Sequence, residues 1–279
     1  MTRVVTWWIF LRISIEERLV YRGDFMLGTL MRFLPIVTQV FLWNAIFDAT
    51  RSDDPQTASI AGFSRYDMMA YYLLAMVGRA FSSMPGLTSG VARQIQSGEI
   101  KKFLTQPVDP IGCMLLQRIA HKLVYYLIAT LPFALVFYLC RSFFPEGWPS
   151  AGVLVGFVLS LVMAFLLGFF IEFCLGMVGF WFLEITSLAF IYMLLNFFLS
   201  GHMFPLELLD VGSPMLRTIV EAFPLKYLAY FPAAVFLGKV PEDRLAWELM
   251  IEACWLLFFV VLARVLWWRG TARYSAFGG

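Results

Sequence analysis

The sequence predicts an all-α, polytopic membrane protein with six transmembrane helices. Of its 279 residues, 61% are hydrophobic and only 14% are charged, whereas soluble domains carry about 25% charged residues. Its 29 phenylalanines add more apolar surface than a soluble protein of this length could bury. Six mostly apolar stretches have about the length that crosses a bilayer, roughly 20 residues. We therefore expect one transmembrane domain over residues 1–279, with lipid around much of its surface.

The first 23 residues predict an amphipathic helix at the membrane surface, ahead of the spans. At helical spacing one stripe of this segment is apolar and consists of Val4, Trp8, Leu11, Ile15 and Leu19. The charged side chains gather away from that stripe, at Arg3, Arg12, Glu16 and Glu17. Such a helix lies in the headgroup region with its apolar side toward the acyl chains. The alternative is that these residues simply continue the first span.

The candidate spans follow in order along the chain. They cover residues 25–47, 66–86, 112–139, 151–175, 180–200 and 245–268. The stretch from 201 to 244 is less apolar and contains five prolines, so no helix of spanning length fits within it. We expect short re-entrant or interfacial helices there, on the outer side before the last span.

The distribution of Lys and Arg predicts that both termini are cytoplasmic. With this orientation, 13 of the 21 basic residues lie inside and seven lie outside, in agreement with the usual excess of positive charge on cytoplasmic loops. The same orientation puts most of the tryptophans near the two membrane interfaces. Residues 92–110 then face the cytoplasm, between the second and third spans.

Residues 92–110, ARQIQSGEIKKFLTQPVDP, predict a short cytoplasmic helix. The Ser-Gly-Glu at 97–99 suits a helix start, and two later prolines stop a longer helix. Between these limits Ile100, Phe103 and Leu104 share one face. A helix of two to three turns is unstable alone and needs a surface on which to dock. That surface is either lipid or another protein.

The outer end of the fifth predicted span is a candidate gate. A glycine and a proline break the helix there, and an asparagine within the span needs a hydrogen-bond partner. We assign six residues to this candidate gate: Asn196, Ser200, Gly201, His202, Phe204 and Pro205. The alternative is a plain helix stop at the membrane surface. For His202 the alternatives are a pH-sensitive gate and a surface histidine without a special role.

Ionisable residues within the spans cost about 2.5–3.5 kcal/mol on insertion scales, so they need a partner or a purpose. The candidates are Arg79 in the second span and Glu248 with Glu252 in the sixth. The two glutamates share a helix face because they are four residues apart. Arg79 is expected to line a subunit interface or to pair with a glutamate. Glu172 and Glu184 are expected near the inner turn between the fourth and fifth spans, where water reaches them.

Several kinds of chemistry are excluded by what the sequence lacks. It has no G-x-x-x-x-G-K-[ST] motif for a nucleotide. Its four cysteines and two histidines show no metal-ligand spacing, and the histidines have no obvious nucleophile partner. The net charge of +2, without a basic run, gives no sign of nucleic-acid binding. We therefore expect no catalysis, no metal and no bound cofactor in this chain.

Four segments, in their order and spacing, carry a family resemblance over nearly the whole chain. They are the amphipathic N-terminal segment, SGEIKKFLTQPVDP after the second span, FLSGHMFPLELL at the end of the fifth and FPLKYLAYFPAAVFLG before the sixth. Together they resemble an ABC-2 type transporter permease, the membrane-spanning subunit of a bacterial ABC exporter. The GFW after the fourth span and the Tyr-Phe-Pro before the last resemble the subgroup whose operons often carry two paired permeases.

The resemblance implies ATP-driven export of an amphipathic or hydrophobic molecule across the bacterial inner membrane. It implies that ATP and Mg²⁺ are bound by a separate ABC ATPase, two copies of which dock beneath two permeases, either identical or related. The short cytoplasmic helix is then a coupling helix whose ATPase contact is formed by Gly98, Glu99, Ile100, Lys101, Lys102, Phe103 and Leu104. The alternative function is an ion- or proton-coupled secondary transporter, which needs inverted repeats that the sequence does not show.

Overall fold

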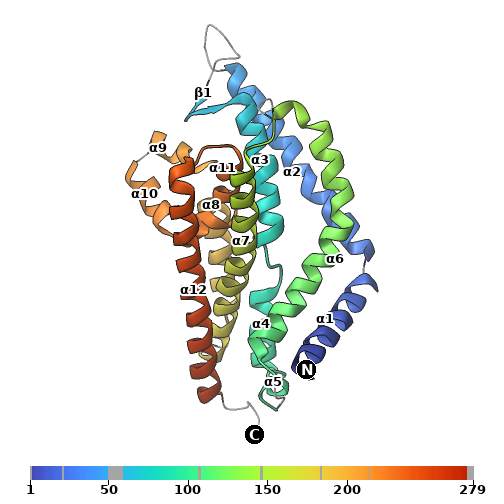
Figure 1. Ribbon diagram of the computed structural model, residues 1–279. Coiled ribbons are helices and arrows are strands. Elements are labelled where there is room, and N and C mark those ends of the chain that lie inside the picture. Colours follow the sequence, from blue (N-terminus) through green and yellow to red (C-terminus); the bar gives the residue numbers. More distant parts are fainter. Residues whose placement is uncertain are drawn as a thin grey trace. The chain divides into compact units, whose positions relative to one another are not determined.

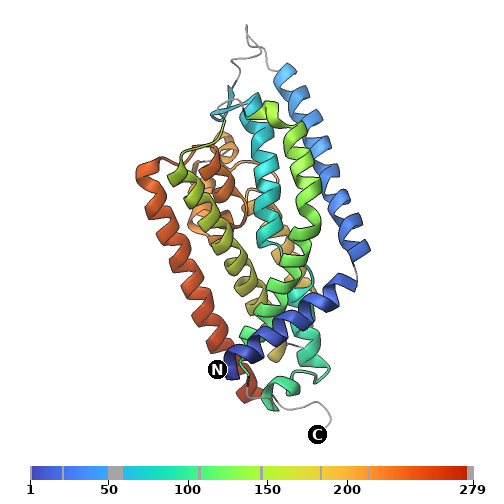
Figure 2. The same ribbon diagram turned by 45° about the vertical axis from the view of Figure 1, so that its right-hand side comes forward.

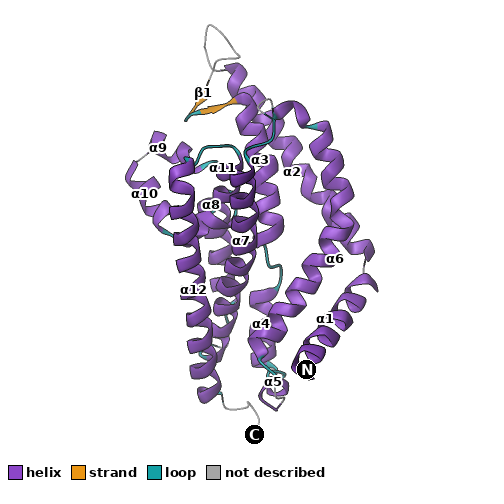
Figure 3. Ribbon diagram, viewed as in Figure 1, coloured by secondary structure: helices purple, strands orange, loops and turns teal. Residues whose placement is uncertain are grey.

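The computed structural model describes residues 2–20, 22–49, 59–105, 108–144, 147–182, 184–212 and 214–274. Over these residues the chain is mostly helical, with one short two-stranded hairpin (Figures 1 and 3). The all-α class predicted from the sequence is confirmed at this level.

The α-helices are α1 Thr2–Val20, α2 Arg22–Ala49, α3 Arg65–Ser82, α4 Leu87–Gln96, α5 Lys101–Thr105, α6 Pro110–Leu139, α7 Ala151–Met177, α8 Thr186–Leu199, α9 Leu209–Gly212, α10 Pro214–Ala222, α11 Tyr230–Phe236 and α12 Glu242–Arg273. The 3-10 helices are η1 Arg141–Phe143, η2 Val178–Phe180, η3 Leu206–Leu208 and η4 Pro224–Leu228. The hairpin consists of the antiparallel strands β1 Ser59–Ile60 and β2 Phe63–Ser64.

Two of the longer helices begin where the sequence supplies a capping side chain. Ser64 and Asp67 form a capping box at the start of α3, with the Asp67 N–H donating to Ser64 Oγ at 3.1 Å. Asp109 accepts a bond from the Gly112 N–H at 3.0 Å at the start of α6, where Pro110 occupies the first turn. Each cap satisfies an N–H group that has no partner within its helix.

Three of the described helices are long and apolar enough to cross a membrane. They are α6, α7 continued by η2, and α12, of 30, 30 and 32 residues. At a rise of 1.5 Å per residue, 30 residues extend roughly 45 Å, more than the ~30 Å hydrocarbon layer of a bilayer. The prediction of a membrane protein is supported by these three helices, and the total of six spans stays a prediction.

The second predicted span, over residues 66–86, is not one continuous helix. α3 ends at Ser82, and Pro85 and Gly86 interrupt the chain before α4 begins at Leu87. Gly86 has a φ of +71°, a left-handed conformation that favours glycine. The residue before a proline is in turn biased away from the helical region. The helix within the second predicted span therefore ends four residues before the predicted limit.

The fifth predicted span, over residues 180–200, is also shorter than expected. η2 ends at Phe180, and α8 begins at Thr186 and has only 14 residues. Fourteen residues rise roughly 21 Å, which is less than the hydrocarbon thickness. The prediction of one helix over this whole range is wrong. By contrast α2 covers the first predicted span completely.

The chain divides into two compact units, and the first contains residues 1–42 and 101–142. Within it α1 packs along α6 (Figure 2). The ring of Trp7 lies over Gly112, where an added Cβ would be 3.0 Å from the ring. Trp8, the next residue, is 66% exposed. The predicted N-terminal surface helix is thus present as α1, and its position in a membrane stays a prediction.

The second unit contains residues 43–100 and 143–279, and α7 is its central helix. α7 packs against α12, α3, α4 and α11. Glycines on α7 allow two of these close approaches: a Cβ on Gly168 would lie 2.2 Å from the carbonyl oxygen of Ser82, and one on Gly176 would lie 2.7 Å from Cβ of Val91. The core of this unit includes the fully buried side chains of Tyr71, Phe169, Phe173, Tyr227 and Phe231.

Residues 201–244 fold into short helices, as the proline content predicts. The described elements in this stretch are η3, α9, α10, η4 and α11, none longer than nine residues. Whether these helices re-enter a membrane stays a prediction.

Candidate functional site

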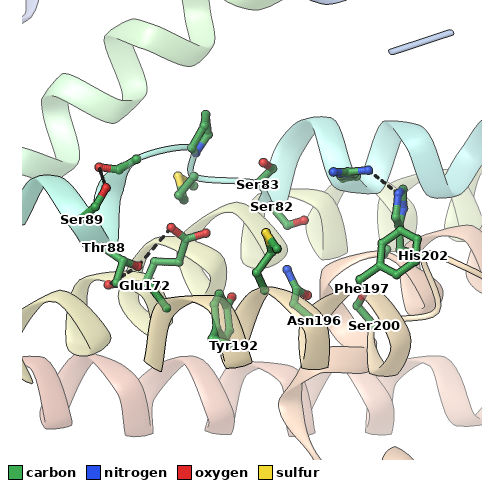
Figure 4. Close-up of a pocket in the computed structure, with 17 residues that line it drawn as sticks. Ser82, Ser83, Thr88, Ser89, Glu172, Tyr192, Asn196, Phe197, Ser200 and His202 are labelled. Atoms are coloured by element: carbon green, nitrogen blue, oxygen red, sulfur yellow. Dashed lines mark hydrogen bonds between the residues drawn. The ribbon is translucent and has the colours of Figure 1, made fainter. Parts of the chain in front are cut away.

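A cavity of about 340 Å³ lies within the second unit, at the break between α3 and α4 (Figure 4). Its wall is formed by the end of α3, the break at residues 83–86, the first turn of α4, Glu172 of α7, one face of α8 and the residues that follow α8. Its volume lies at the lower end of the ~300–1,000 Å³ range of small-molecule sites. We take this cavity as the candidate functional site.

α8 contributes one face to the cavity because its lining residues recur at helical spacing. Ala189, Tyr192, Met193, Asn196 and Phe197 occupy positions i, i+3, i+4, i+7 and i+8. The side-chain oxygen of Asn196 is buried and has no hydrogen-bond partner among the described residues. Because a buried acceptor without a partner is costly, this oxygen is ready to accept a bond from a donor that enters the cavity.

Arg79 and His202 meet in the cavity wall. Nη1 of Arg79 lies 2.5 Å from Nε2 of His202. A guanidinium donates hydrogen bonds and accepts none, so Nε2 of His202 accepts and the proton of the neutral ring is on Nδ1. Burial, followed by the charge of Arg79, lowers the pKa of His202 to about 3 from its usual 6.5. His202 Nδ1 is buried and has no partner among the described residues, which makes it an available N–H donor.

A carboxylate lies in another part of the cavity wall. Glu172 of α7 lies beside the first turn of α4, where Thr88 Oγ1 is 3.4 Å from the carboxylate and 3.1 Å from the backbone oxygen of Glu172. In Figure 4, Glu172 and His202 lie toward opposite ends of the labelled residues, with Tyr192 and Asn196 between them. An acidic side chain and a basic side chain therefore lie in different parts of the cavity wall, Glu172 in one and Arg79 with His202 in the other.

The turn that carries His202 is fixed by its backbone. The Tyr71 hydroxyl donates to the carbonyl of Gly201, and the Tyr72 hydroxyl donates to the carbonyl of Met203 at 2.8 Å. The N–H of Tyr230 donates to the carbonyl of Ser200 at 2.9 Å. Three tyrosines from α3 and α11 thus hold the turn in place.

Gly201 is required by the conformation and packing of the same turn. Its φ is +76°, and an added Cβ would lie 2.5 Å from Cβ of Tyr230 and 2.7 Å from the Tyr71 hydroxyl. Both the left-handed backbone and the missing space favour glycine.

The predicted coupling segment begins where α4 ends. Gly98 has a φ of +78°, and the N–H of Ile100 donates to the carbonyl of Gln94 at 2.9 Å, a pattern typical of a helix C-terminus closed by glycine. Gly98 therefore ends α4, and the prediction that it starts a helix is wrong. Ile100 is fully buried, whereas Glu99 is exposed.

The helix within the coupling segment is shorter than predicted. α5 has five residues, little more than one turn. Lys101 and Lys102 are exposed and Phe103 is half-buried, with Nζ of Lys102 5.2 Å from the centre of the Phe103 ring. The side chain of Leu104 lies outside the described side chains. The segment therefore presents charged groups from one short turn.

A family model described as ABC-2 family transporter protein matches residues 33–278. The chain belongs to this ABC-2 family. The family resemblance stated from the sequence is confirmed, and the protein is an ABC-2 permease component of an ABC transporter. A search of curated proteins found no match to the chain.

The cavity of this ABC-2 permease includes only part of the predicted gate. Asn196, Ser200 and His202 line it. The other three predicted gate residues are outside its lining, and these are Gly201, Phe204 and Pro205. Arg79, predicted separately as an intramembrane charge, also lines the cavity.

The other two intramembrane charges of the ABC-2 permease lie outside this cavity, on α12. Glu248 accepts bonds from Lys226 Nζ at 3.0 Å and from the Tyr227 hydroxyl at 2.8 Å. Glu252 is fully buried, and neither of its carboxylate oxygens has a partner among the described residues. Glu248 thus has the partners that an intramembrane charge needs, and the sequence had not indicated them.

Sequence reasoning missed two polar residues that line the cavity of the ABC-2 permease. Thr88 was not considered, and Glu172 was expected near an inner turn rather than in a cavity wall. The Pro85-Gly86 pair is a turn signal that could have located the break. A helix break exposes the first turn of the helix that follows it, so the same signal could have identified Thr88 as a candidate lining residue.

Proposed function

We propose that this ABC-2 permease is the membrane subunit of an ATP-driven exporter and that a separate ABC ATPase docks on residues 98–104. ATP and Mg²⁺ bind to the ATPase rather than to this chain. Two ATPase copies act on two permeases, either two copies of this chain or this chain with a related one. The cavity at the α3–α4 break holds the substrate during transport.

The observation that carries this proposal is that α4 joins the cavity to the coupling segment. The residues at its start, Gly86, Thr88 and Ser89, line the cavity. Its last turn runs directly into Gly98 and the buried Ile100. The ten residues of α4 rise roughly 15 Å. Because a helix is stiff over this length, a displacement at the coupling segment reaches the cavity wall.

The packing of α4 suits a helix that moves as a rigid body. On the α7–η2 side the contact is made by glycines: a Cβ on Gly176 would lie 2.7 Å from Cβ of Val91, and one on Gly179 would lie 3.4 Å from Cβ of Ala92. Small residues let the two backbones lie close together, so α4 can shift along α7 without displacing bulky side chains. Closely packed helices of this kind change between discrete arrangements.

The exposed residues of the coupling segment suit a charged protein surface. Glu99, Lys101 and Lys102 are exposed, and complementary charges steer and orient docking partners. The buried side chain of Ile100 anchors the start of the segment in the second unit. We infer that the charged side chains, with Phe103, make the ATPase contact.

The N-terminal helix supports a location at a membrane surface. Trp8 and Ile13 of α1 are exposed apolar side chains. Arg12 and Glu16 on the same helix form an exposed pair at 2.9 Å. A helix with both kinds of exposed residue lies at a lipid interface. We infer that α1 lies on the inner leaflet of a bacterial inner membrane.

The experiment that tests the proposal is co-purification of the tagged permease with its ATPase, combined with ATP-driven transport in vesicles. The double variant Glu99→Lys with Lys102→Glu keeps the net charge of the coupling segment and exchanges the positions of one negative and one positive charge. We expect it to lose most of the retained ATPase and of the transport. Asp243→Lys, a reversal of an exposed charge at the start of α12 and outside the coupling segment, is the control. Equal ATPase retention and transport in all three proteins would overturn the proposal.

One observation favours a second candidate, an ion- or proton-coupled secondary transporter. A discontinuous helix beside charged groups is typical of ion-coupled sites, and the α3–α4 break lies beside Arg79 and Glu172. The two candidates differ in their energy source. Transport in vesicles that persists without ATP and stops with a protonophore would support the secondary transporter.

A further inference from the structure

We propose that a second cavity, at the end of α11, binds a quaternary ammonium group between aromatic rings. This aromatic cavity has a volume of about 150 Å³ and lies in the second unit. It shares no lining residue with the cavity at the α3–α4 break. The inference goes beyond the proposed function, because it depends neither on an ATPase nor on a transported substrate.

The wall of the aromatic cavity is poor in hydrogen-bonding groups. Four of its nine lining residues are aromatic, and these are Phe143, Phe144, Trp148 and Phe236. Four others are glycine, proline or leucine, so among the described residues Asp67 is the one lining side chain that accepts a hydrogen bond. A primary ammonium would lose bonds to water here without replacing them. A quaternary ammonium has no N–H group and avoids that cost.

The rings of the aromatic cavity meet at steep angles. The planes of Phe144 and Trp148 are inclined to that of Phe236 by 83° and 71°, each with ring centres 6.1 Å apart. Phe157 of α7, which is not in the lining, packs against Phe236 at 5.2 Å and supports its ring. Rings that do not stack line different sides of a cavity. A cation within about 6 Å of a ring centre is attracted by the negative face of the ring.

The attraction comes from the rings, because the carboxylate in the wall has partners within the protein. Asp67 pairs with Lys239 at 2.8 Å and accepts a bond from the Ser64 N–H at 3.2 Å. Nζ of Lys239 also lies 4.8 Å from the centre of the Phe63 ring. Neither charge requires a ligand, so binding depends on cation–π contact with the aromatic wall.

The volume of the aromatic cavity suits a trimethylammonium head. A volume of 150 Å³ is that of about five molecules of liquid water. The head of choline consists of one nitrogen, three methyl groups and a methylene group, which is a comparable number of heavy atoms. Trp148 is 82% exposed, so the wall reaches the surface there and the rest of the ligand stays outside. The head can belong to free choline or to a lipid headgroup.

The test titrates the full-length protein, labelled with fluorinated tryptophan, in nanodiscs of phosphatidylethanolamine and phosphatidylglycerol, which contain no quaternary ammonium. The fluorine NMR resonance of Trp148 is the line that is missing from Trp148→Phe. The probes are choline and its uncharged isostere 3,3-dimethylbutan-1-ol, in which carbon replaces nitrogen. We expect choline to shift the line saturably, with a midpoint roughly tenfold lower than that of the isostere, a ratio that cation–π contacts produce.

Three variants test whether the ring of Phe236 contributes. Phe236→Leu keeps an apolar side chain and is expected to weaken choline binding roughly fivefold, with a smaller effect on the isostere. Phe236→Tyr keeps the ring and should keep the preference for choline. Phe223→Leu, at an exposed phenylalanine outside the cavity, is the control, and thermal unfolding confirms that each variant is folded.

Two results would overturn the inference. One is an equal midpoint for choline and its isostere, or no saturable shift, in the unmodified protein. The other is an unchanged choline midpoint in folded Phe236→Leu.

Nanodiscs of phosphatidylcholine identify the source of the ammonium group. If a lipid headgroup occupies the cavity, the Trp148 line lies at its choline-bound position before any choline is added. If the ligand is a free molecule, choline shifts the line as it does in the other lipids. Each outcome supports the site and assigns its source. A line at the same position in both lipids that choline moves in neither would contradict the site.

Discussion

Nη1 of Arg79 and Nε2 of His202 lie 2.5 Å apart, although the two residues are 123 positions apart in the chain. This contact joins the last turn of α3 to the turn that follows α8. It also determines the protonation of His202, because the only nitrogen that can accept from a guanidinium is an unprotonated one. A separation of α3 from the turn therefore changes the proton affinity of His202.

The first prediction concerns the pH dependence of stability. The pKa of His202 is lowered to about 3 in the folded protein, against about 6.5 in the unfolded chain. Between these values the unfolded state binds a proton and the folded state does not. The contribution of His202 to stability is thus present above pH 6.5 and is lost as the pH falls toward 3, by about 1.4 kcal/mol per pH unit. We expect His202→Gln to make the fall in melting temperature from pH 7 to pH 4 shallower.

Asn196→Ala is the control for this measurement. It changes another cavity residue that does not titrate, so the pH slope should match that of the unmodified protein. If His202→Gln leaves the slope unchanged as well, His202 is not held neutral by its surroundings.

The second prediction concerns the turn held by the tyrosines. Gly201→Ala places a Cβ 2.5 Å from Cβ of Tyr230 at a residue with φ of +76°. Left-handed strain and overpacking together are expected to cost about 2–4 kcal/mol of unfolding free energy. Gly238 has a φ of +64° but no atom within 4 Å of its Cβ position, so Gly238→Ala should cost only about 1–2 kcal/mol. Equal losses of stability would show that the close packing at Gly201 contributes nothing.

The sequence predicts local features of this protein better than it predicts the site. Apolar stretches and proline positions located α6, α7 and α12 and the short helices of the outer segment, because these features depend on neighbouring residues. The length of α8 was overestimated, since hydropathy alone does not tell a helix from the apolar irregular segment before Thr186.

The cavity itself depends on pairings between distant segments. No local pattern in the sequence places Arg79 beside His202. None places Thr88 beside Glu172 either, since these two residues are 84 positions apart. Pro85 indicated a helix break in the sequence, but nothing in the sequence indicated that one face of α8 lines the same cavity as this break. Ile100 likewise matched the predicted docking face, and only the fold shows that it is buried.

The third prediction concerns the approach of α7 to the end of α3. A Cβ on Gly168 would lie 2.2 Å from the backbone oxygen of Ser82, an atom that cannot rotate away. Gly168→Ala is therefore expected to destabilise the protein by about 1–3 kcal/mol and to weaken ligand binding, because Ser82 lines the cavity. The control, Gly152→Ala, is on the same helix with its nearest neighbour at 4.0 Å. It should be neutral or stabilising by up to about 1 kcal/mol, as alanine favours helix. The reverse order of the two melting temperatures would contradict this account of the packing.

The fourth prediction tests whether α4 moves during transport. A Cβ on Gly179 of η2 would lie 3.4 Å from Cβ of Ala92 on α4, close to the ~3.8 Å separation found in disulfides. The double variant Ala92→Cys with Gly179→Cys should therefore form a disulfide under oxidation and fix α4 to the end of α7.

If α4 transmits the movement of the coupling segment to the cavity, the oxidised double variant should lose ATP-driven transport, and reduction should restore it. Ligand binding to the fixed cavity should persist in both states, because the cross-link lies outside the cavity lining. Each single cysteine variant under the same oxidant controls for the four native cysteines. Mass spectrometry of the 92–179 peptide pair reports the extent of cross-linking. Full transport by a completely cross-linked protein would mean that α4 stays fixed on α7, and the coupling route would have to run through another element.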